Sequence, residues 1–257
     1  MITLNIPDYI EQMLVPNLLN WEQLRILVQS TSNEILQIAH TTVESRLHYA
    51  NMELNILNQV YNPPSSFEKA LMKRSIFESI IINLVSSLEA TAHVINQIYE
   101  LGAEYRLVSI DHKFYYNEKK HRDASKNCIR CKVMHVNSKL QSFLDETLNR
   151  GSPVEEWYEA LMEFRNQIVH RPHYIALQIA GGPPGYYIPD DPKIIGTKVR
   201  FDKEKGIPVN SNFTLMREMK EFAEISTSMI LLIIEEIYRL ILEDKNIKER
   251  MKIFHNF

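Results

Sequence analysis

Three side chains near the end of one segment have the chemistry to act on a phosphodiester: Arg165, Asn166 and His170. Asn166 and His170 are four residues apart, so they share a face if the segment is a helix, and the long Arg165 side chain can reach the same phosphate. Histidine transfers protons near neutral pH, arginine neutralises charge that develops on phosphoryl oxygens, and an asparagine amide can position either group. The three residues therefore form a candidate site for RNA cleavage.

The flanking residues predict a well-bounded helix around this motif. Ser152 is a suitable N-cap, Pro153 suits the first helical position, and Pro172 cannot continue the helix. A similar arginine-to-histidine spacing occurs elsewhere without such boundaries, at Arg106/His112, Arg130/His135 and Arg250/His255. Spacing alone also fits a structural interpretation, in which His170 and Arg171 are cations that stabilise the end of a helix.

Beyond spacing, Arg165-Asn166-x-x-x-His170 near the end of a core helix resembles the signature of the HEPN superfamily. Members of this superfamily are compact all-helical domains, often found in ribonuclease toxins and phage-defence proteins. The segment Leu84–Thr91 resembles the part of such domains that faces the motif helix. The resemblance covers roughly residues 20 to 172 and the last long helix. It implies an all-α HEPN-like bundle.

The resemblance also implies an activity, a metal-independent endoribonuclease in a toxin or phage-defence role that needs no cofactor. The ribose 2′-hydroxyl would attack phosphorus, leaving a cyclic phosphate and a 5′-hydroxyl. Arg165, Asn166 and His170 would be the catalytic residues, and two copies of the motif would meet in a homodimer. A cognate antitoxin or another partner protein would fit such a role. Three residues of the preceding helix are candidates to support the motif: Ser86, Glu89 and His93.

RNA contact requires a local basic patch, because the formal net charge of the chain is -3. A basic cluster at residues 119–122 follows Lys113, Tyr115 and Tyr116, which offers phosphate attraction and stacking surfaces. The predicted RNA-binding residues are Lys119, Lys120, Arg122 and Arg171. A solvated loop explains the same charges without RNA.

Composition predicts one mostly helical domain across residues 1–257, since 45% of its residues are hydrophobic and only seven are glycines. Apolar residues recur at helical spacing. Four to five long helices are expected, at about 21–61, 67–101, 125–148, 153–172 and 213–244. Glycines and prolines between residues 173 and 212 predict an irregular or β-hairpin-like insertion before the last helix.

Two other patterns bear on metal binding. His121, Cys128, Cys131 and His135 offer the ligand types of zinc but lack the usual long separation between pairs, so reduced cysteines are favoured. Glu44/His48 and Glu89/His93 are spaced as helix-supporting pairs, one residue longer than the Glu-x-x-His of metal-binding bundles. No metal is therefore predicted. A metal-binding bundle remains one alternative, and a non-catalytic HEPN-like module that binds a nucleotide or protein is another.

A cytoplasmic protein without a membrane segment is expected. The first residues lack the basic start and apolar core of a signal peptide. The strongly apolar stretch Met229–Ile234 runs directly into charged residues and is too short to cross a bilayer. It is better interpreted as a buried helix, packed against the bundle or against a second subunit.

Overall fold

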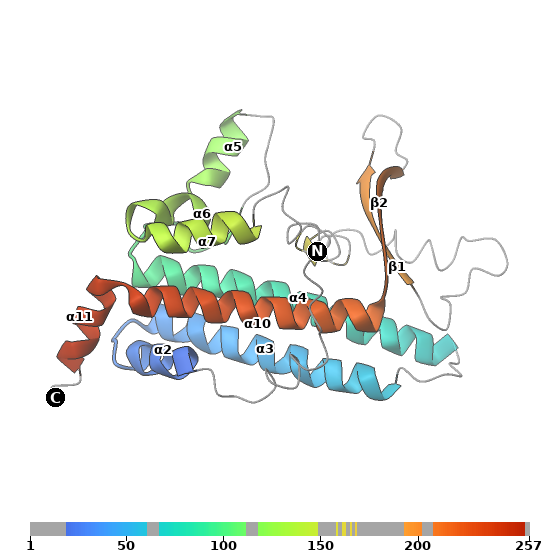
Figure 1. Ribbon diagram of the computed structural model, residues 1–257, viewed down its shortest axis with the longest axis horizontal. Coiled ribbons are helices and arrows are strands. Elements are labelled where there is room, and N and C mark those ends of the chain that lie inside the picture. Colours follow the sequence, from blue (N-terminus) through green and yellow to red (C-terminus); the bar gives the residue numbers. More distant parts are fainter. Residues whose placement is uncertain are drawn as a thin grey trace. The chain divides into compact units, whose positions relative to one another are not determined.

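The computed structural model describes residues 19–60, 67–111, 118–148, 158, 161, 162, 165, 168, 193–201 and 208–254 (Figure 1). Most of these residues are helical, which confirms the prediction of a mostly helical protein. That the helices form a bundle of the HEPN type stays a prediction.

The helices differ widely in length, and the two longest contribute 27 and 32 residues. In chain order they are α2 (Leu19–Gln29), α3 (Glu34–Val60), α4 (Phe67–Ile98), α5 (Glu118–Ser125), α6 (Ile129–Lys132), the short 3-10 helix η1 (Val133–His135), α7 (Ser138–Leu148), α10 (Met219–Glu243) and α11 (Lys245–Phe254). The strands are β1 (Lys193–Phe201) and β2 (Pro208–Glu218).

The chain divides into two compact units. Unit 1 comprises residues 1–47, 86–155 and 228–257, and unit 2 comprises residues 48–85 and 156–227. Helices α3, α4 and α10 each contribute residues to both units.

Unit 1 is built around the apolar faces of its helices. Fully buried side chains of α2, α3, α4, α7 and α10 include Leu24, Val43, Val94, Ile95, Leu140, Leu144, Ile234, Ile237 and Ile241, and α6 and η1 add Ile129 and Val133. Polar contacts also join the helices: Trp21 of α2 donates to Glu44 of α3 at 2.8 Å, and Asn33, just before α3, donates to Gln97 of α4 at 3.1 Å. In the apolar middle of α10, three residues are therefore buried within the chain, as one of the two sequence interpretations expected, and the other three are half-buried: Ile230, Ile233 and Ile234, then Met229, Leu231 and Leu232.

The single helix expected at about 21–61 was wrong, because that stretch contains α2 and α3 as separate helices. Asn33 begins α3 as its N-cap, with its Oδ1 accepting the Leu36 amide at 3.0 Å.

The single helix expected at about 125–148 was wrong as well. That stretch contains the end of α5, then α6, η1 and α7 as separate elements. Between α5 and α6, Cys128 pairs as an isolated bridge with Ser109, and the Ile129 amide donates to the Ser109 carbonyl at 2.9 Å. Asn137 then begins α7 as its N-cap, because its Oδ1 accepts the Leu140 amide at 3.0 Å. A helical apolar pattern continues across both interruptions, which is why spacing alone could not reveal them.

Unit 2 contains parts of α3, α4 and α10 together with both strands. Glu53 of α3 accepts hydrogen bonds from two residues of α4, Ser79 at 2.5 Å and Asn83 at 2.9 Å. The rings of Phe77 and Phe222 meet edge to face, with centroids 6.2 Å apart. These contacts fix α4 against α3 and α10 within the unit.

Strands β1 and β2 pair in an antiparallel register that runs from Lys193 opposite Glu218 to Phe201 opposite Pro208. The register shifts between Thr197 and Val199. Because β2 extends to Glu218, the last long helix begins later than the sequence pattern predicted. Of the insertion predicted at residues 173–212, only the parts within these two strands lie among the described residues.

One helix in the described part of the chain is long and apolar enough to cross a membrane by length and composition alone. This segment is Met72–Ile98, with a mean hydropathy of 1.2 over its most apolar window. That window is 61% buried inside the protein, and it carries the buried polar residues Asn83, Ser87 and Thr91. A buried core helix passes the same test, so the segment is weak evidence for a membrane span.

Candidate functional site

Of the three motif residues, the structure describes Arg165, while Asn166 and His170 lie outside the described residues. Arg165 is helical and half-buried, and it belongs to unit 2. It follows Leu161 by four residues and Tyr158 by seven, and both of these side chains are buried. Arg165 therefore shares a helical face with two buried residues.

The three predicted supporting residues lie on α4 in unit 1, and two of them make contacts there. Glu89 accepts hydrogen bonds from the Ser109 hydroxyl at 3.2 Å and from the Ile110 amide at 3.4 Å. The ring of His93 lies 4.7 Å from that of Tyr105, and burial lowers the pKa of His93. Ser86 is half-buried. Glu89 thus anchors the loop before α5, and a supporting role for these residues at the motif stays a prediction.

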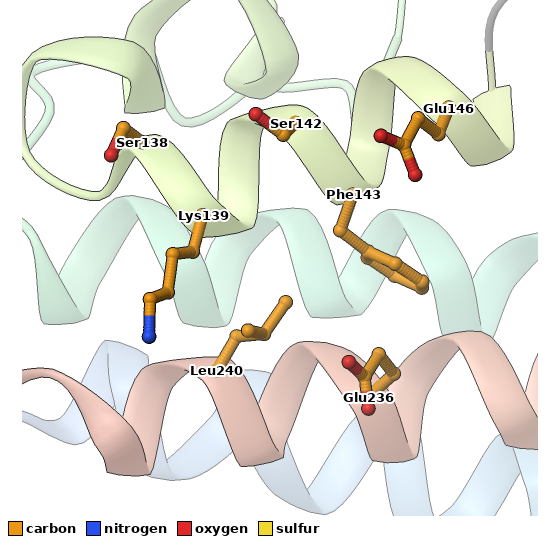
Figure 2. Close-up of a pocket in the computed structure, with 7 residues that line it drawn as sticks. All are labelled: Ser138, Lys139, Ser142, Phe143, Glu146, Glu236 and Leu240. Carbon is orange, nitrogen blue, oxygen red and sulfur yellow. The ribbon is translucent and has the colours of Figure 1, made fainter.

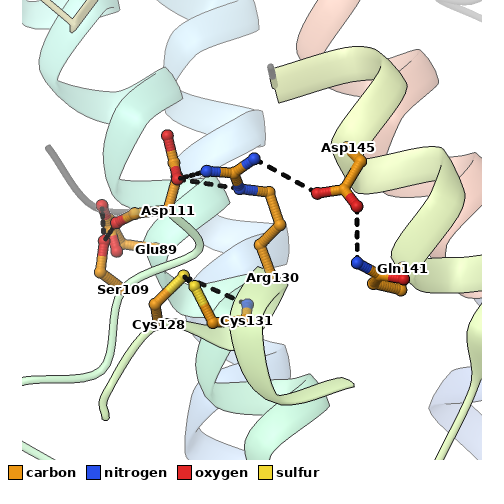
Figure 3. Close-up of polar contacts among 8 residues, drawn as sticks. All are labelled: Glu89, Ser109, Asp111, Cys128, Arg130, Cys131, Gln141 and Asp145. Atoms are coloured by element: carbon orange, nitrogen blue, oxygen red, sulfur yellow. Dashed lines mark hydrogen bonds and ion pairs between the residues drawn. The ribbon is translucent and has the colours of Figure 1, made fainter. Parts of the chain in front are cut away.

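A charged network that the sequence did not reveal surrounds Arg130 (Figure 3). Its guanidinium contacts Asp111 Oδ1 through Nη2 at 2.8 Å and through Nε at 3.0 Å. Its remaining nitrogen, Nη1, reaches Asp145 Oδ1 at 3.2 Å, and Gln141 donates to the other oxygen of Asp145 at 2.5 Å. The network joins the loop before α5 to α6 and α7. No spacing rule could predict it, because Asp111 and Asp145 are 19 and 15 residues from Arg130.

The two cysteines lie at the edge of this network. Cys128 is buried and caps α6, with its sulfur accepting the Cys131 amide at 3.3 Å. The two sulfurs are 2.9 Å apart, and Cys131 is exposed. Among the described residues, no group of three or more histidine, cysteine or acidic side chains is placed to hold a metal ion. The side chain of His121 lies outside them, and His135 is exposed.

These cysteines have pKa values shifted in opposite directions. Their mutual hydrogen bond, followed by burial, raises the pKa of Cys128. The same hydrogen bond lowers the pKa of Cys131, and the positive charge of Arg130 acts in the same direction against the effect of burial. Cys131 is therefore the better nucleophile of the pair.

The predicted RNA-binding segment includes helix α5, where Lys119 and Arg122 are exposed. The side chain of Lys120 and all of Arg171 lie outside the described residues. Five of the eight residues of α5 are charged and three of those are basic, counting from its sequence EKKHRDAS. The helix therefore presents a local positive charge on an otherwise acidic chain.

A shallow groove runs between α7 and α10 in unit 1 (Figure 2). Its lining consists of Ser138, Lys139, Ser142, Phe143, Glu146, Glu236 and Leu240. Phe143 and Leu240 form an apolar floor, with Lys139 toward one end and the two glutamates toward the other. Two carboxylates against one ammonium repel a phosphate backbone, so this groove is a poor candidate for RNA binding.

A cluster of three aromatic side chains in unit 1 could not be predicted from the sequence. Trp21, His40 and Tyr238 lie within 6 Å of one another by ring centroid, and His40 stacks on Tyr238 with an interplanar angle of 16°. Glu44, which sequence spacing had associated with His48, instead accepts from Trp21 and lies 3.8 Å from His40 Nδ1. His48 is exposed. The contacts of the Glu44 carboxylate are therefore with Trp21 and His40 of unit 1.

No protein-family model matches this sequence, and no curated protein or solved structure matches it either. The resemblance to HEPN domains therefore depends on the motif and its helical setting.

Proposed function

We propose that this protein is a metal-independent endoribonuclease of the HEPN type, with Arg165, Asn166 and His170 as its catalytic residues. The observation that carries the proposal is the Arg-Asn-x-x-x-His motif in a segment whose sequence predicts a bounded helix. The helical state of Arg165 and of its described neighbours supports it, because a helix places residues four apart on one face. The mostly helical fold is also of the expected class.

In the proposed reaction, His170 takes the proton of the ribose 2′-hydroxyl. The resulting oxygen attacks phosphorus, the bond to the 5′-oxygen breaks, and that oxygen leaves with a proton to become a hydroxyl. A cyclic phosphate remains on the other fragment. Proton transfer by a positioned histidine accelerates such a step by roughly 10²–10⁴-fold. Arg165 neutralises charge on the phosphoryl oxygens, and Asn166 positions the phosphate or the imidazole.

Selection of RNA over DNA follows from the reaction, because the nucleophile is the 2′-hydroxyl. Lys119 and Arg122 on α5 are exposed and would attract the phosphate backbone, together with Lys120 and Arg171. A cytoplasmic toxin or phage-defence protein is the role we propose for such an activity, restrained by a cognate antitoxin or partner protein.

The proposal includes a homodimer in which two motifs share one cleft. A second copy needs an exposed apolar surface, and α3 provides one in unit 2. Tyr49, Met52 and Ile56 lie three and four residues apart, so they form a single stripe along the helix. Their side chains are 52%, 47% and 43% exposed. A helix of the partner could pack along such a stripe.

The decisive experiment compares the full-length protein with His170→Ala on mixed RNA in the presence of a chelator. We expect cleavage with cyclic-phosphate ends by the native protein and none by the variant. His135→Ala is the matched control, because His135 also follows an arginine by five residues but is exposed outside the motif. A substrate with 2′-deoxyribose at the cleavage position should not be cleaved by the native protein.

Two other outcomes count against the proposal. Equal cleavage by the native protein and His170→Ala would indicate a contaminating nuclease or a different site. RNA binding by both proteins without cleavage, across several RNAs, would favour a non-catalytic HEPN-like module that uses the same basic residues.

A further inference from the structure

Cys128 occupies a rigid position in unit 1. Its backbone amide donates to the Ser125 carbonyl at 3.3 Å, and the next two amides donate to the carbonyls of Ser109 and Ile110. The side chain is fully buried. Cys128 is therefore held from both sides of the turn that precedes α6.

Cys131 lies one helical turn further on and is exposed. Residues three apart on a helix have Cβ atoms about 5–6 Å apart, whereas a disulfide requires about 3.5–4.5 Å. The capping conformation of Cys128, with φ -82° and ψ 118°, closes this gap by directing its side chain back toward the Cys131 amide. The distance between the two sulfurs is 2.9 Å. It exceeds the length of a disulfide bond by about 1 Å or less.

The surroundings favour ionisation of the exposed sulfur. Arg130 adjoins Cys131 and carries a permanent positive charge, although Asp111 and Asp145 share that charge. The pKa of Cys131 is lowered by the hydrogen bond with Cys128 and by Arg130. An exposed thiolate beside a buried thiol is the arrangement in which one sulfur attacks a reagent and the other completes the exchange.

We propose that Cys128 and Cys131 form a reactive dithiol that small-molecule disulfides of the glutathione class oxidise to an intramolecular disulfide. In the first step the Cys131 thiolate attacks one sulfur of glutathione disulfide. The sulfur–sulfur bond of the reagent breaks, and one glutathione leaves as a thiolate that takes up a proton. Cys131 now carries the other glutathione as a mixed disulfide.

In the second step Cys128 loses its proton, and its sulfur attacks Cys131 Sγ. The mixed disulfide breaks and the second glutathione leaves, taking up that proton. Two protein thiols have been oxidised to one disulfide, and one glutathione disulfide has been reduced to two thiols. Although its hydrogen bond with Cys131 and its burial raise the pKa of Cys128, contact between the sulfurs compensates by making the attack intramolecular.

The Cys128–Cys131 disulfide would contribute little to the free energy of unfolding. It would close a loop of only four residues, and a short loop removes little conformational entropy from the unfolded chain. Arg130 lies inside this loop, so oxidation would constrain the residue that joins Asp111 and Asp145.

The test uses the full-length reduced protein and glutathione disulfide, followed by acid quenching, alkylation and mass spectrometry. These are the only cysteines in the sequence, so each product has a distinct mass. We expect the native protein to lose two hydrogen atoms, with a peptide in which Cys128 and Cys131 are linked. A reducing thiol should reverse the change. Cys128→Ser should accumulate one glutathione on Cys131, whereas Cys131→Ser should react much more slowly while folded.

Circular dichroism of each variant verifies folding, and the same reagent applied in denaturant gives the intrinsic reactivity of each thiol. Arg130→Gln should slow formation of the mixed disulfide in the Cys128→Ser background. The proposal is overturned if the native protein accumulates the mixed disulfide without closing the bond. It is equally overturned if folded Cys131→Ser reacts as fast as Cys128→Ser, or if the native protein stays reduced under conditions that modify Cys128→Ser.

Discussion

Arg130 contacts a single carboxylate oxygen of Asp111 through two guanidinium nitrogens, Nη2 at 2.8 Å and Nε at 3.0 Å. The Asp111 side chain is only 11% exposed and that of Arg130 is 20% exposed. Water therefore screens the pair less than it screens a surface ion pair. The contact ties the segment that follows α4 to the start of α6.

Replacement of Arg130 by glutamine should lower the free energy of unfolding by about 1–3 kcal/mol, because it leaves the Asp111 carboxylate half-buried without its cationic partner. Urea denaturation measures the change. Arg239→Gln is the control, since Arg239 also contacts two carboxylates but is 40% exposed, and we expect at most about 1 kcal/mol there. Equal losses in both variants would contradict a special role for the Arg130 contacts.

Helix periodicity was sufficient to locate α4, because its long apolar face ends near a glycine signal in the sequence. It merged α2 and α3 into one helix, because the apolar pattern continues across the Asn33 cap that separates them. It failed between α5 and α7, where Cys128 and Asn137 interrupt an apolar pattern that continues beyond them. Those interruptions depend on hydrogen bonds to Ser109 and Leu240, which are distant in the sequence. Local propensity contains no information about such partners.

The same difference between local patterns and distant partners applies to the candidate sites. A motif such as Arg165-Asn166-x-x-x-His170 is local, so the sequence can propose it without the fold. The partner of Glu89 could not be proposed in that way, because Ser109 and Ile110 reach it only through the path of the chain after α4. The sequence also paired Glu44 with His48, whereas folding brings Trp21 to that carboxylate.

His40 should make the protein less stable in acid. It is 2% exposed and stacks on Tyr238, and burial lowers its pKa, with Arg25 acting in the same direction and Glu44 opposing. The unfolded chain then binds the proton more tightly than the folded chain. The free energy of unfolding is therefore fully retained above about pH 6.5 and falls as the pH drops below that value, by at most about 1.4 kcal/mol per pH unit for one group.

Between about pH 7 and about pH 5, His40→Gln should make the free energy of unfolding depend less steeply on pH. Urea denaturation at several pH values measures the slope for each protein. His48→Gln on the same helix should leave it unchanged, because His48 is exposed. Burial also lowers the pKa of His93, so some slope should survive in His40→Gln. An unaltered slope in that variant would refute the assignment to His40.

Asn137 should be among the most sensitive polar residues of unit 1. It is 8% exposed, its Oδ1 caps α7, and its Nδ2 donates to the Tyr99 hydroxyl at 2.8 Å and to the Leu240 carbonyl at 3.2 Å. Loss of the cap and of two buried hydrogen bonds should cost about 2–4 kcal/mol in Asn137→Ala.

Asn137→Asp separates the two contributions, since a carboxylate can cap α7 but cannot donate to Leu240. We expect its loss to be smaller than that of Asn137→Ala if the cap dominates, and larger if burial of an unpaired charge dominates. Ser142→Ala, an exposed site on the same helix, should change stability by no more than about 0.5 kcal/mol. A loss at Asn137→Ala as small as that of this control would show that its hydrogen bonds are unimportant.

If α5 binds RNA, replacing both Lys119 and Arg122 by alanine should weaken binding to single-stranded RNA. The slope of log affinity against log salt should become shallower by about 0.7 for each phosphate that the variant no longer neutralises. Binding measured at several salt concentrations gives this slope. Lys248→Ala is a suitable control, because Lys248 is an exposed lysine on α11. Unchanged affinity and slope in the double variant would exclude α5 from the RNA-binding surface.

Met52→Glu should dissociate a homodimer that forms along α3. The side chain is 47% exposed, between Tyr49 and Ile56 on the same stripe, so a charge there costs little in a single copy of the chain. In an interface the same carboxylate would lose its hydration without gaining a partner. Sedimentation should then show a native dimer and a monomeric variant. If two motifs share one cleft, as we propose, RNA cleavage should fall in parallel. Leu107→Glu, at a side chain that is 56% exposed in a turn, should remain dimeric. A dimeric Met52→Glu would place the interface on another surface.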